Sequence, residues 1–138
     1  MWRYGNPVDV RFGNGVFDRL GQLVSGRPYA LVTYGEPVFD ALAARAAHLA
    51  GTPAATIRNI GPNPDFRTLT QSCAALKSVG RVELIVAIGG GSVIDAAKVL
   101  AAAGDDFARV RTFLESGAGE DRLLALPIIA VAPLAGPG

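Results

Sequence analysis

The sequence has very little of what builds disulfides and metal centres. Its 138 residues include one cysteine, Cys73, and one histidine, His48. A single cysteine excludes an internal disulfide, and we expect Cys73 to be a reduced, unreactive thiol on a helix. One imidazole makes no metal site, so we interpret His48 as a surface or packing residue. Because the two residues fall in separate predicted helices, the sequence predicts no catalytic residue and no metal ligand set.

An excess of one charge and a long apolar run are missing as well. Thirteen Lys and Arg residues against twelve Asp and Glu give a net charge of +1, which offers no electrostatic basis for binding nucleic acid or an acidic membrane surface. No apolar run approaches the roughly 20 residues of a transmembrane helix, and residues 1–4 do not open a signal peptide. We therefore expect a cytoplasmic protein.

Apolar residues, in contrast, are abundant. They make up 50% of the chain against 18% charged residues, and the mean hydropathy is +0.32. This balance is apolar for a free-standing domain and predicts a face that contacts another domain or subunit. The length predicts one domain over residues 1–138. We expect a homodimer or larger assembly, with residues 8–12 as an edge strand whose unpaired backbone groups could bind a neighbour.

Strands and helices alternate along the chain. The apolar patterns predict strands at 8–12, 29–34, 55–60, 84–88 and 126–132. Helical patterns lie between them, at 16–24, 37–50, 66–79, 92–103 and 105–114, and Asp65 is well placed as an N-cap. This alternation predicts an α/β fold, a Rossmann-like open parallel sheet with helices on both faces. In such sheets ligands bind at the carboxyl ends of the strands.

The rest of the chain is organised around residues 83–98. Leu84–Ile88 is the continuous apolar run of a strand buried on both faces, three glycines end it, and a helical pattern begins at Ser92. Glycines let the backbone approach a phosphate closely, and the first N–H groups of the following helix point at it. The stretch therefore predicts an anion site built by Gly89, Gly90, Gly91 and Ser92.

An interpretation without a ligand stays open for the same residues. Ser92 and Asp95 have the spacing of a capping box and could only satisfy helix N–H groups. Lys98 is one turn beyond Asp95 and could simply pair with it on the surface.

The same stretch carries a family resemblance. Residues 89–98 resemble the GGGSxxDxxK motif of the iron-containing alcohol dehydrogenases. Three further matches fall at similar distances: the FGNG of 12–15, the PNP of 62–64 and the strand 126–131. The resemblance covers residues 8–138 and corresponds to the N-terminal, cofactor-binding half of the family. Residues 2–8 together with 61–64 are faintly similar to the phosphonoacetaldehyde reductases of that family.

The resemblance implies a binding site for NAD or NADP. Besides the glycine turn and Ser92, it assigns Asp95 and Lys98 to the cofactor motif, and it matches Asn63 to an asparagine on the adenosine side. Alternatively, Asn63 serves only as a turn residue and contacts no cofactor. Where the family commonly has an Asp that binds the ribose hydroxyls, this chain has Tyr34, followed by Gly35 and Glu36. A phenol does not repel a ribose phosphate, so NADPH is not excluded. Glu36 could replace the Asp or could interact with a helix dipole.

The end of the chain departs from the family pattern. Where relatives continue the last strand with PTTAGTG, residues 132–138 read APLAGPG. Pro133 and Leu134 stand at two threonine positions that contact the pyrophosphate and nicotinamide side, and Pro137 stands at a third. The hydroxyl donors are lost at all three positions, and proline removes a backbone N–H at two of them.

The resemblance implies an oxidoreductase that transfers a hydride between NAD(P)H and a small alcohol or aldehyde. In intact relatives iron or zinc is held by a helical C-terminal domain, which is absent here, so we expect this chain alone to be inactive. Two alternatives remain. One is a non-catalytic nucleotide-binding or dimerising module, truncated by nature or in preparation. The other is half of a lyase of the dehydroquinate synthase type, against which the GGGSxxDxxK spacing argues.

Overall fold

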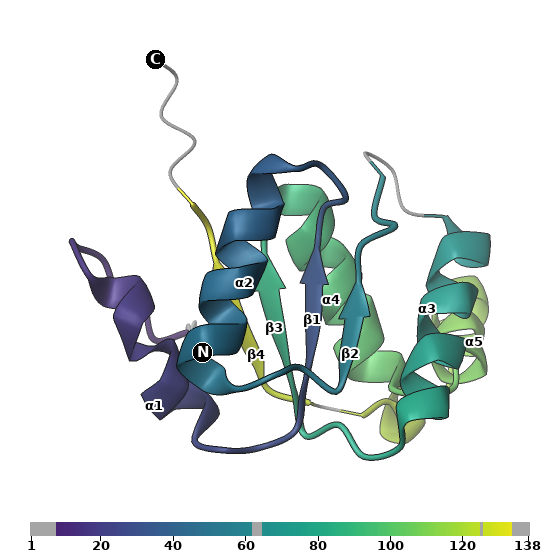
Figure 1. Cartoon of the computed structure of the whole chain (residues 1–138). Helices are drawn as coiled ribbons and strands as arrows, with labels where there is room; N and C mark the ends of the chain where they lie inside the picture. The colour runs from purple at the N-terminus through teal and green to yellow at the C-terminus, as the bar shows by residue number, and fades with distance from the viewer. Residues whose placement is uncertain (1–7, 62–64, 125, 134–138) are drawn as a thin grey trace, which may run out of the picture.

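The computed structural model describes residues 8–61, 65–124 and 126–133 (Figure 1). In chain order its elements are η1 (Val16–Arg19), α1 (Leu20–Val24), β1 (Tyr29–Thr33), α2 (Val38–Ala50), β2 (Ala55–Ile57), α3 (Phe66–Val79), β3 (Leu84–Ile88), α4 (Gly91–Ala103), α5 (Ala108–Ser116), η2 (Glu120–Arg122) and β4 (Ile128–Val131). No helix in these ranges is long and apolar enough to cross a membrane.

The four strands form one parallel sheet in the order β2-β1-β3-β4. The two central strands are paired along their whole length, from Tyr29 opposite Leu84 to Thr33 opposite Ile88. All ten of their residues are buried, which explains why both read as continuous apolar runs. The chain leaves β1 toward β2 on one side and leaves β3 toward β4 on the other. The strand order therefore reverses between β1 and β3.

Helices cover both faces of the sheet, as the alternation predicts. One core cluster joins alternate residues of β1 and β3 to α1 and α2, and a second joins the intervening residues to α3, α4 and α5. In Figure 1, α2 lies in front of the sheet and α4 behind it. The predicted α/β, Rossmann-like fold with a doubly covered parallel sheet is confirmed.

Local signals fix several boundaries where the sequence predicts them. The Asp65 carboxylate caps α3 by accepting a hydrogen bond from the Thr68 backbone N–H at 2.8 Å, and this bond lowers the pKa of the Asp65 carboxyl. Gly104, with φ of 62°, ends α4 and donates its N–H to the carbonyl of Leu100 at 2.7 Å.

The predicted first strand at 8–12 is wrong. These residues pair with no strand of the described sheet, and Val8, Val10 and Phe12 are 66%, 77% and 82% exposed. Alternation of apolar residues indicates an extended segment, but a strand also needs a partner strand, and local sequence does not encode the partner. The following helix is also split, because η1 precedes a short α1.

Other boundaries shift by a few residues. The strand predicted at 55–60 is confined to Ala55–Ile57, and the one predicted at 126–132 to Ile128–Val131. The helix predicted at 105–114 runs from Ala108 to Ser116. Displacements of this size are usual where helix ends fray and neighbouring strands set the paired length.

Close packing of α1 on α2 yields the first prediction. A Cβ at Gly21 would lie 2.3 Å from the backbone carbonyl oxygen of Leu49, which cannot move without distorting α2. We expect Gly21→Ala to lower the free energy of unfolding by about 1–3 kcal/mol, the usual cost of overpacking. Urea denaturation followed by circular dichroism measures this. Gly61→Ala is the matched control, because a Cβ there meets no atom within 4 Å, and an equal loss in both variants would contradict the packing explanation.

Candidate functional site

The candidate site is the turn of Gly89, Gly90 and Gly91 between β3 and α4. It lies at the carboxyl end of β3, beside the carboxyl end of β1, because Thr33 and Ile88 are partners in the ladder. This is the point where the strand order reverses, and ligands of open parallel sheets bind there. The fold thus places the glycine turn at the edge where the sequence predicts a ligand.

The three glycines have different roles. Gly89 is buried with φ of +157°, and a Cβ there would lie 2.9 Å from Cγ2 of Val93 and 3.0 Å from Cε2 of Tyr34. Gly90 has φ of −90° and ψ of −159°, a conformation open to any residue, and it is exposed. Gly91 is also exposed, and a Cβ there would meet no atom within 4 Å. The fold therefore needs glycine at position 89, while positions 90 and 91 leave exposed backbone, with the Tyr34 hydroxyl 3.4 Å from a Cβ at Gly90 and open space beside Gly91.

The start of α4 is not a capping box. Gly90 is the N-cap, no side chain caps the helix, and Ser92 lies inside the first turn. The capping-box interpretation of Ser92 and Asp95 is wrong, because the three consecutive glycines allow the helix to begin two residues earlier than it would with Ser92 as its N-cap. The surface pair expected between Lys98 and Asp95 is confirmed, since Nζ of Lys98 lies 3.5 Å from Oδ1 of Asp95. Both side chains are well exposed and their charges offset one another.

Tyr34 lies against the glycine turn. It follows β1 directly, and its hydroxyl oxygen is 3.4 Å from the position that a Cβ would take at Gly90. Its ring packs edge to face on Phe39 of α2, with centroids 5.0 Å apart at 63°. The structure therefore brings Tyr34 together with Gly89 and Gly90. Glu36 is exposed just before α2, and Gly35 is exposed as well.

Two predicted contact residues, Asn63 and Leu134, lie outside the described residues. Pro133 is described and follows β4, whose Val131 pairs with Ile88. The carboxyl ends of β1, β3 and β4 therefore meet at the glycine turn.

Sequence reasoning missed Thr33 as a residue of this edge. Its side chain is 0% exposed, and its hydroxyl donates a 2.8 Å hydrogen bond to the carbonyl of Ile88, the last residue before the turn. A polar residue at the end of an otherwise apolar buried strand is the signal that could have identified it.

The remaining reactive side chains lie away from the turn. Cys73 is buried on α3, and burial, followed by the charges of Asp106 and Asp105, raises the pKa of its thiol to about 11. The thiol therefore stays protonated at neutral pH, as predicted for an unreactive residue. His48 is exposed on α2. Within the described ranges no three His, Cys, Asp or Glu side chains gather as metal ligands would.

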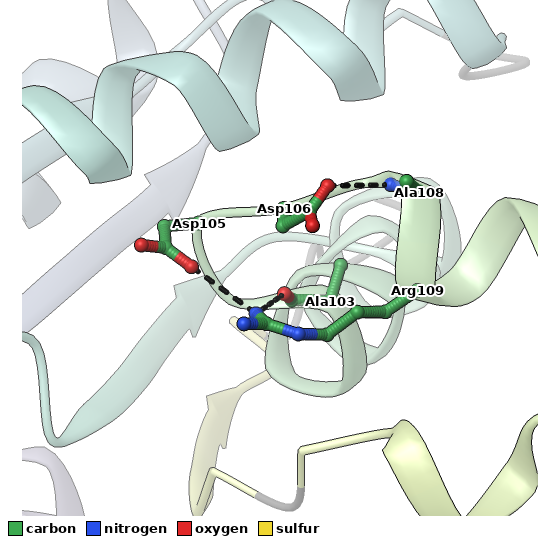
Figure 2. A network of polar contacts seen from close by, with 5 residues as sticks. All are labelled: Ala103, Asp105, Asp106, Ala108 and Arg109. Carbon is green, nitrogen blue, oxygen red and sulfur yellow. Dashed lines mark hydrogen bonds and ion pairs between the residues drawn. The ribbon is translucent and has the colours of Figure 1, made fainter.

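Asp105 and Asp106, the two acidic residues after α4, have structural roles. Figure 2 shows the Asp106 carboxylate accepting the backbone N–H of Ala108 at 3.0 Å. Nη1 of Arg109 donates to the carbonyl of Ala103 at 2.9 Å and to Asp105 at 3.1 Å. These contacts satisfy the end of α4 and the start of α5. Since α4 separates them from the glycine turn by 13 residues, about 20 Å, they belong to no common site with it.

Comparison with known sequences gives a consistent family match. The sequence model of the iron-containing alcohol dehydrogenases matches residues 7–138. "Probable NADH-dependent butanol dehydrogenase 1" of Bacillus subtilis is 31% identical over 108 residues, which cover 72% of this chain and 27% of that protein. The NADPH-dependent aldehyde reductase YqhD of Escherichia coli is 30% identical over 107 residues, covering 70% of this chain and 26% of the relative. The chain thus spans about a quarter of each curated relative.

Solved structures agree on the fold. Sulfoacetaldehyde reductase from Bifidobacterium kashiwanohense, solved in complex with NAD+, is 26% identical with a TM-score of 0.76, over 94% of this chain and 35% of that one. NADH-dependent butanol dehydrogenase A from Thermotoga maritima has the same TM-score of 0.76 at 23% identity, over 96% of this chain and 34% of the other. At that lower identity the likeness shows the fold alone.

Proposed function

Because the chain belongs to the iron-containing alcohol dehydrogenase family, we propose that residues 1–138 form the dinucleotide-binding domain of an NAD(P)-dependent oxidoreductase. The observation that carries the proposal is the glycine turn at the strand-order reversal, with the backbone of Gly90 and Gly91 exposed. The family's substrates, by the names of the relatives, include small alcohols and aldehydes. We expect the same substrate class for an enzyme built on this domain, and a cytoplasmic location.

The diphosphate of the cofactor would bind at the turn. Backbone N–H groups at the start of α4 point toward the carboxyl edge, and the helix dipole adds about half a positive charge there. Small glycine residues let the phosphate oxygens approach this backbone closely. Ser92 adds a hydroxyl in the first turn of the helix, while Asp95 and Lys98 neutralise one another one turn further on.

The adenosine end would lie toward β1. Tyr34 places its hydroxyl beside Gly90, within reach of a ribose bound across the turn. A neutral phenol accepts a ribose hydroxyl or a ribose phosphate without charge repulsion, so the site suits both NAD and NADP. By their names, one of the two curated relatives depends on NADH and the other on NADPH. Asn63 remains our candidate for a further contact on the adenosine side.

The bound nicotinamide would carry the hydride, and the described residues supply binding and orientation only. No metal ligand set is found among them, so iron or zinc would have to be held by residues outside the described ranges. Pro133, at a position where the family has threonine, offers neither a hydroxyl nor a backbone N–H to the cofactor. That residue favours the second candidate, a nucleotide-binding or dimerising module without catalysis of its own. The family match argues against the lyase alternative.

The turn gives a direct binding prediction. Gly90→Val should abolish binding of NAD(H) and NADP(H), because the new methyl groups occupy the space between the backbone and Tyr34, whose hydroxyl is 3.4 Å from the Cβ position. The backbone at Gly90 permits valine, so circular dichroism should stay nearly unchanged. Isothermal titration calorimetry measures binding, and Ala44→Val on the exposed side of α2 is the matched control. Undiminished binding by Gly90→Val would show that the ligand does not use this turn.

Catalysis gives a third prediction. The purified 138-residue chain, supplied with Fe2+ or Zn2+ and NADH or NADPH, should reduce no aldehyde, because the described residues contain no metal ligand set. Absorbance of the reduced cofactor, followed with butanal as substrate, should stay constant. Full-length YqhD under the same conditions is the positive control. Metal-dependent turnover by the chain alone would reveal a ligand set that we have not identified.

The association state of the chain gives a fourth prediction. We expect a homodimer or larger assembly, because residues 8–12 expose three large apolar side chains and the sheet ends in two edge strands, β2 and β4. Sedimentation equilibrium at micromolar concentration should give a multiple of 14.3 kDa. The double variant Val10→Asp, Phe12→Asp should weaken association, whereas Val38→Asp, similarly exposed on α2, should not. A monomeric wild-type chain would contradict the proposal.

A further inference from the structure

We propose that Thr33 is a positioning residue for the glycine turn, whose hydroxyl holds the peptide group between Ile88 and Gly89 in the orientation that phosphate binding needs. The inference deepens the proposed function and rests on it for the ligand. Its structural part concerns this chain alone and can be tested without any nucleotide.

The burial of Thr33 is the first observation. Among the described residues other than the aromatic Tyr29, the fully buried polar side chains are Thr33 and Ser72, 0% and 2% exposed. A buried hydroxyl is tolerated only when it is hydrogen-bonded, and a valine of the same shape would fill the space without that requirement. Thr33 follows Tyr29 and Leu31 on the face that packs against α1 and α2. A valine would pack equally well on that face, so packing does not explain why position 33 carries a hydroxyl.

The partner of the hydroxyl is the second observation. Oγ1 of Thr33 donates to the carbonyl oxygen of Ile88 at 2.8 Å, across the β1–β3 pair. On the other side of β3, the backbone N–H of Gly89 donates to the carbonyl of Val131 at 3.1 Å. The carbonyl and the N–H belong to one planar peptide group. That group is therefore held from β1 on one side and from β4 on the other.

The position of this peptide group gives it a role in the turn. Gly89 follows immediately with φ of +157°, so the chain bends there toward Gly90 and α4. Rotation of the 88–89 peptide would carry the exposed backbone of Gly90 and Gly91 with it. Because anion binding by backbone N–H groups depends on their direction, a link that prevents this rotation sets the geometry of the site.

Amide hydrogen exchange of the chain without nucleotide tests the structural part. In Thr33→Val, exchange of the Gly89 N–H should accelerate about tenfold, the change expected for one lost hydrogen bond to a buried carbonyl. Amides of Leu31 and Ile85, in the interior of the same strands, should change much less, which separates local loosening from global unfolding. Thr33→Ser, which keeps the hydroxyl, should restore the wild-type rate at Gly89.

Ser72→Ala is the matched control. It removes another buried hydroxyl, which donates to the carbonyl of Thr68 within α3 at 3.0 Å, and it should leave Gly89 exchange unaltered relative to Leu31. Should Thr33→Val fold too poorly, Thr33→Cys, with a weaker donor, should give an intermediate acceleration. Unchanged Gly89 exchange in the Thr33 variants, or equal acceleration at all three amides, would overturn the inference.

Nucleotide titration tests the functional part. Thr33→Val should raise the dissociation constant for NAD(P)H about tenfold, with Thr33→Ser close to wild type and Ser72→Ala unchanged. If the wild-type chain binds no dinucleotide, the proposed function fails, and the exchange data still decide whether Thr33 holds the turn. If the wild type binds and Thr33→Val binds equally well, the inference fails while the proposed function stands.

Discussion

Pairing of β1 with β3 is the constraint on which the rest of the structure depends. The two strands are buried on both faces and paired along their whole length, so each contributes to both core clusters at once. Their common carboxyl end lies where the strand order reverses. A shift of register by one residue would exchange the sets of side chains that face the two helix layers. It would also remove Thr33 from the carbonyl of Ile88 and displace Tyr34 from the glycine turn. Fold and candidate site are therefore determined by the same ladder.

Much of this arrangement can be predicted from the sequence because local pattern and tertiary environment agree. The continuous apolar run Leu84–Ile88 could only be a fully buried strand or a helix segment, and the glycines after it favour the strand. Asp65 satisfies the start of α3 by itself, so that boundary needs no tertiary information. The family resemblance adds Tyr34, which no periodicity would single out, and the structure does bring it against Gly89 and Gly90.

Most of the failures arise from contacts distant along the sequence, and one arises from immediately neighbouring residues. Residues 8–12 alternate correctly for a strand, but nothing in the described sheet pairs with them. Ser92 has capping-box spacing, yet the glycines before it let the helix start earlier and place it inside the first turn. The role of Thr33 depends on a partner 55 residues away, so its significance emerges only when β1 and β3 are side by side. Asn63 and Leu134 remain predictions from resemblance.

The site also separates the needs of folding from those of binding. Gly89 is enclosed by Val93 and Tyr34, so the fold requires glycine there. Among the described residues, a Cβ at Gly90 would lie 3.4 Å from the Tyr34 hydroxyl, and a Cβ at Gly91 would meet no atom within 4 Å, so neither position needs glycine for packing. The nearest charged side chains on α4, Asp95 and Lys98, cancel one another. In the site that we propose, attraction for a diphosphate would then come from the oriented backbone and the α4 dipole rather than from Lys98. A backbone dipole attracts an anion only at short range and only when it points toward the anion, whereas a flexible lysine side chain can adjust its position to the ligand. A site of this kind depends on how firmly the strand before it is anchored, and here both neighbouring strands hold that last peptide group.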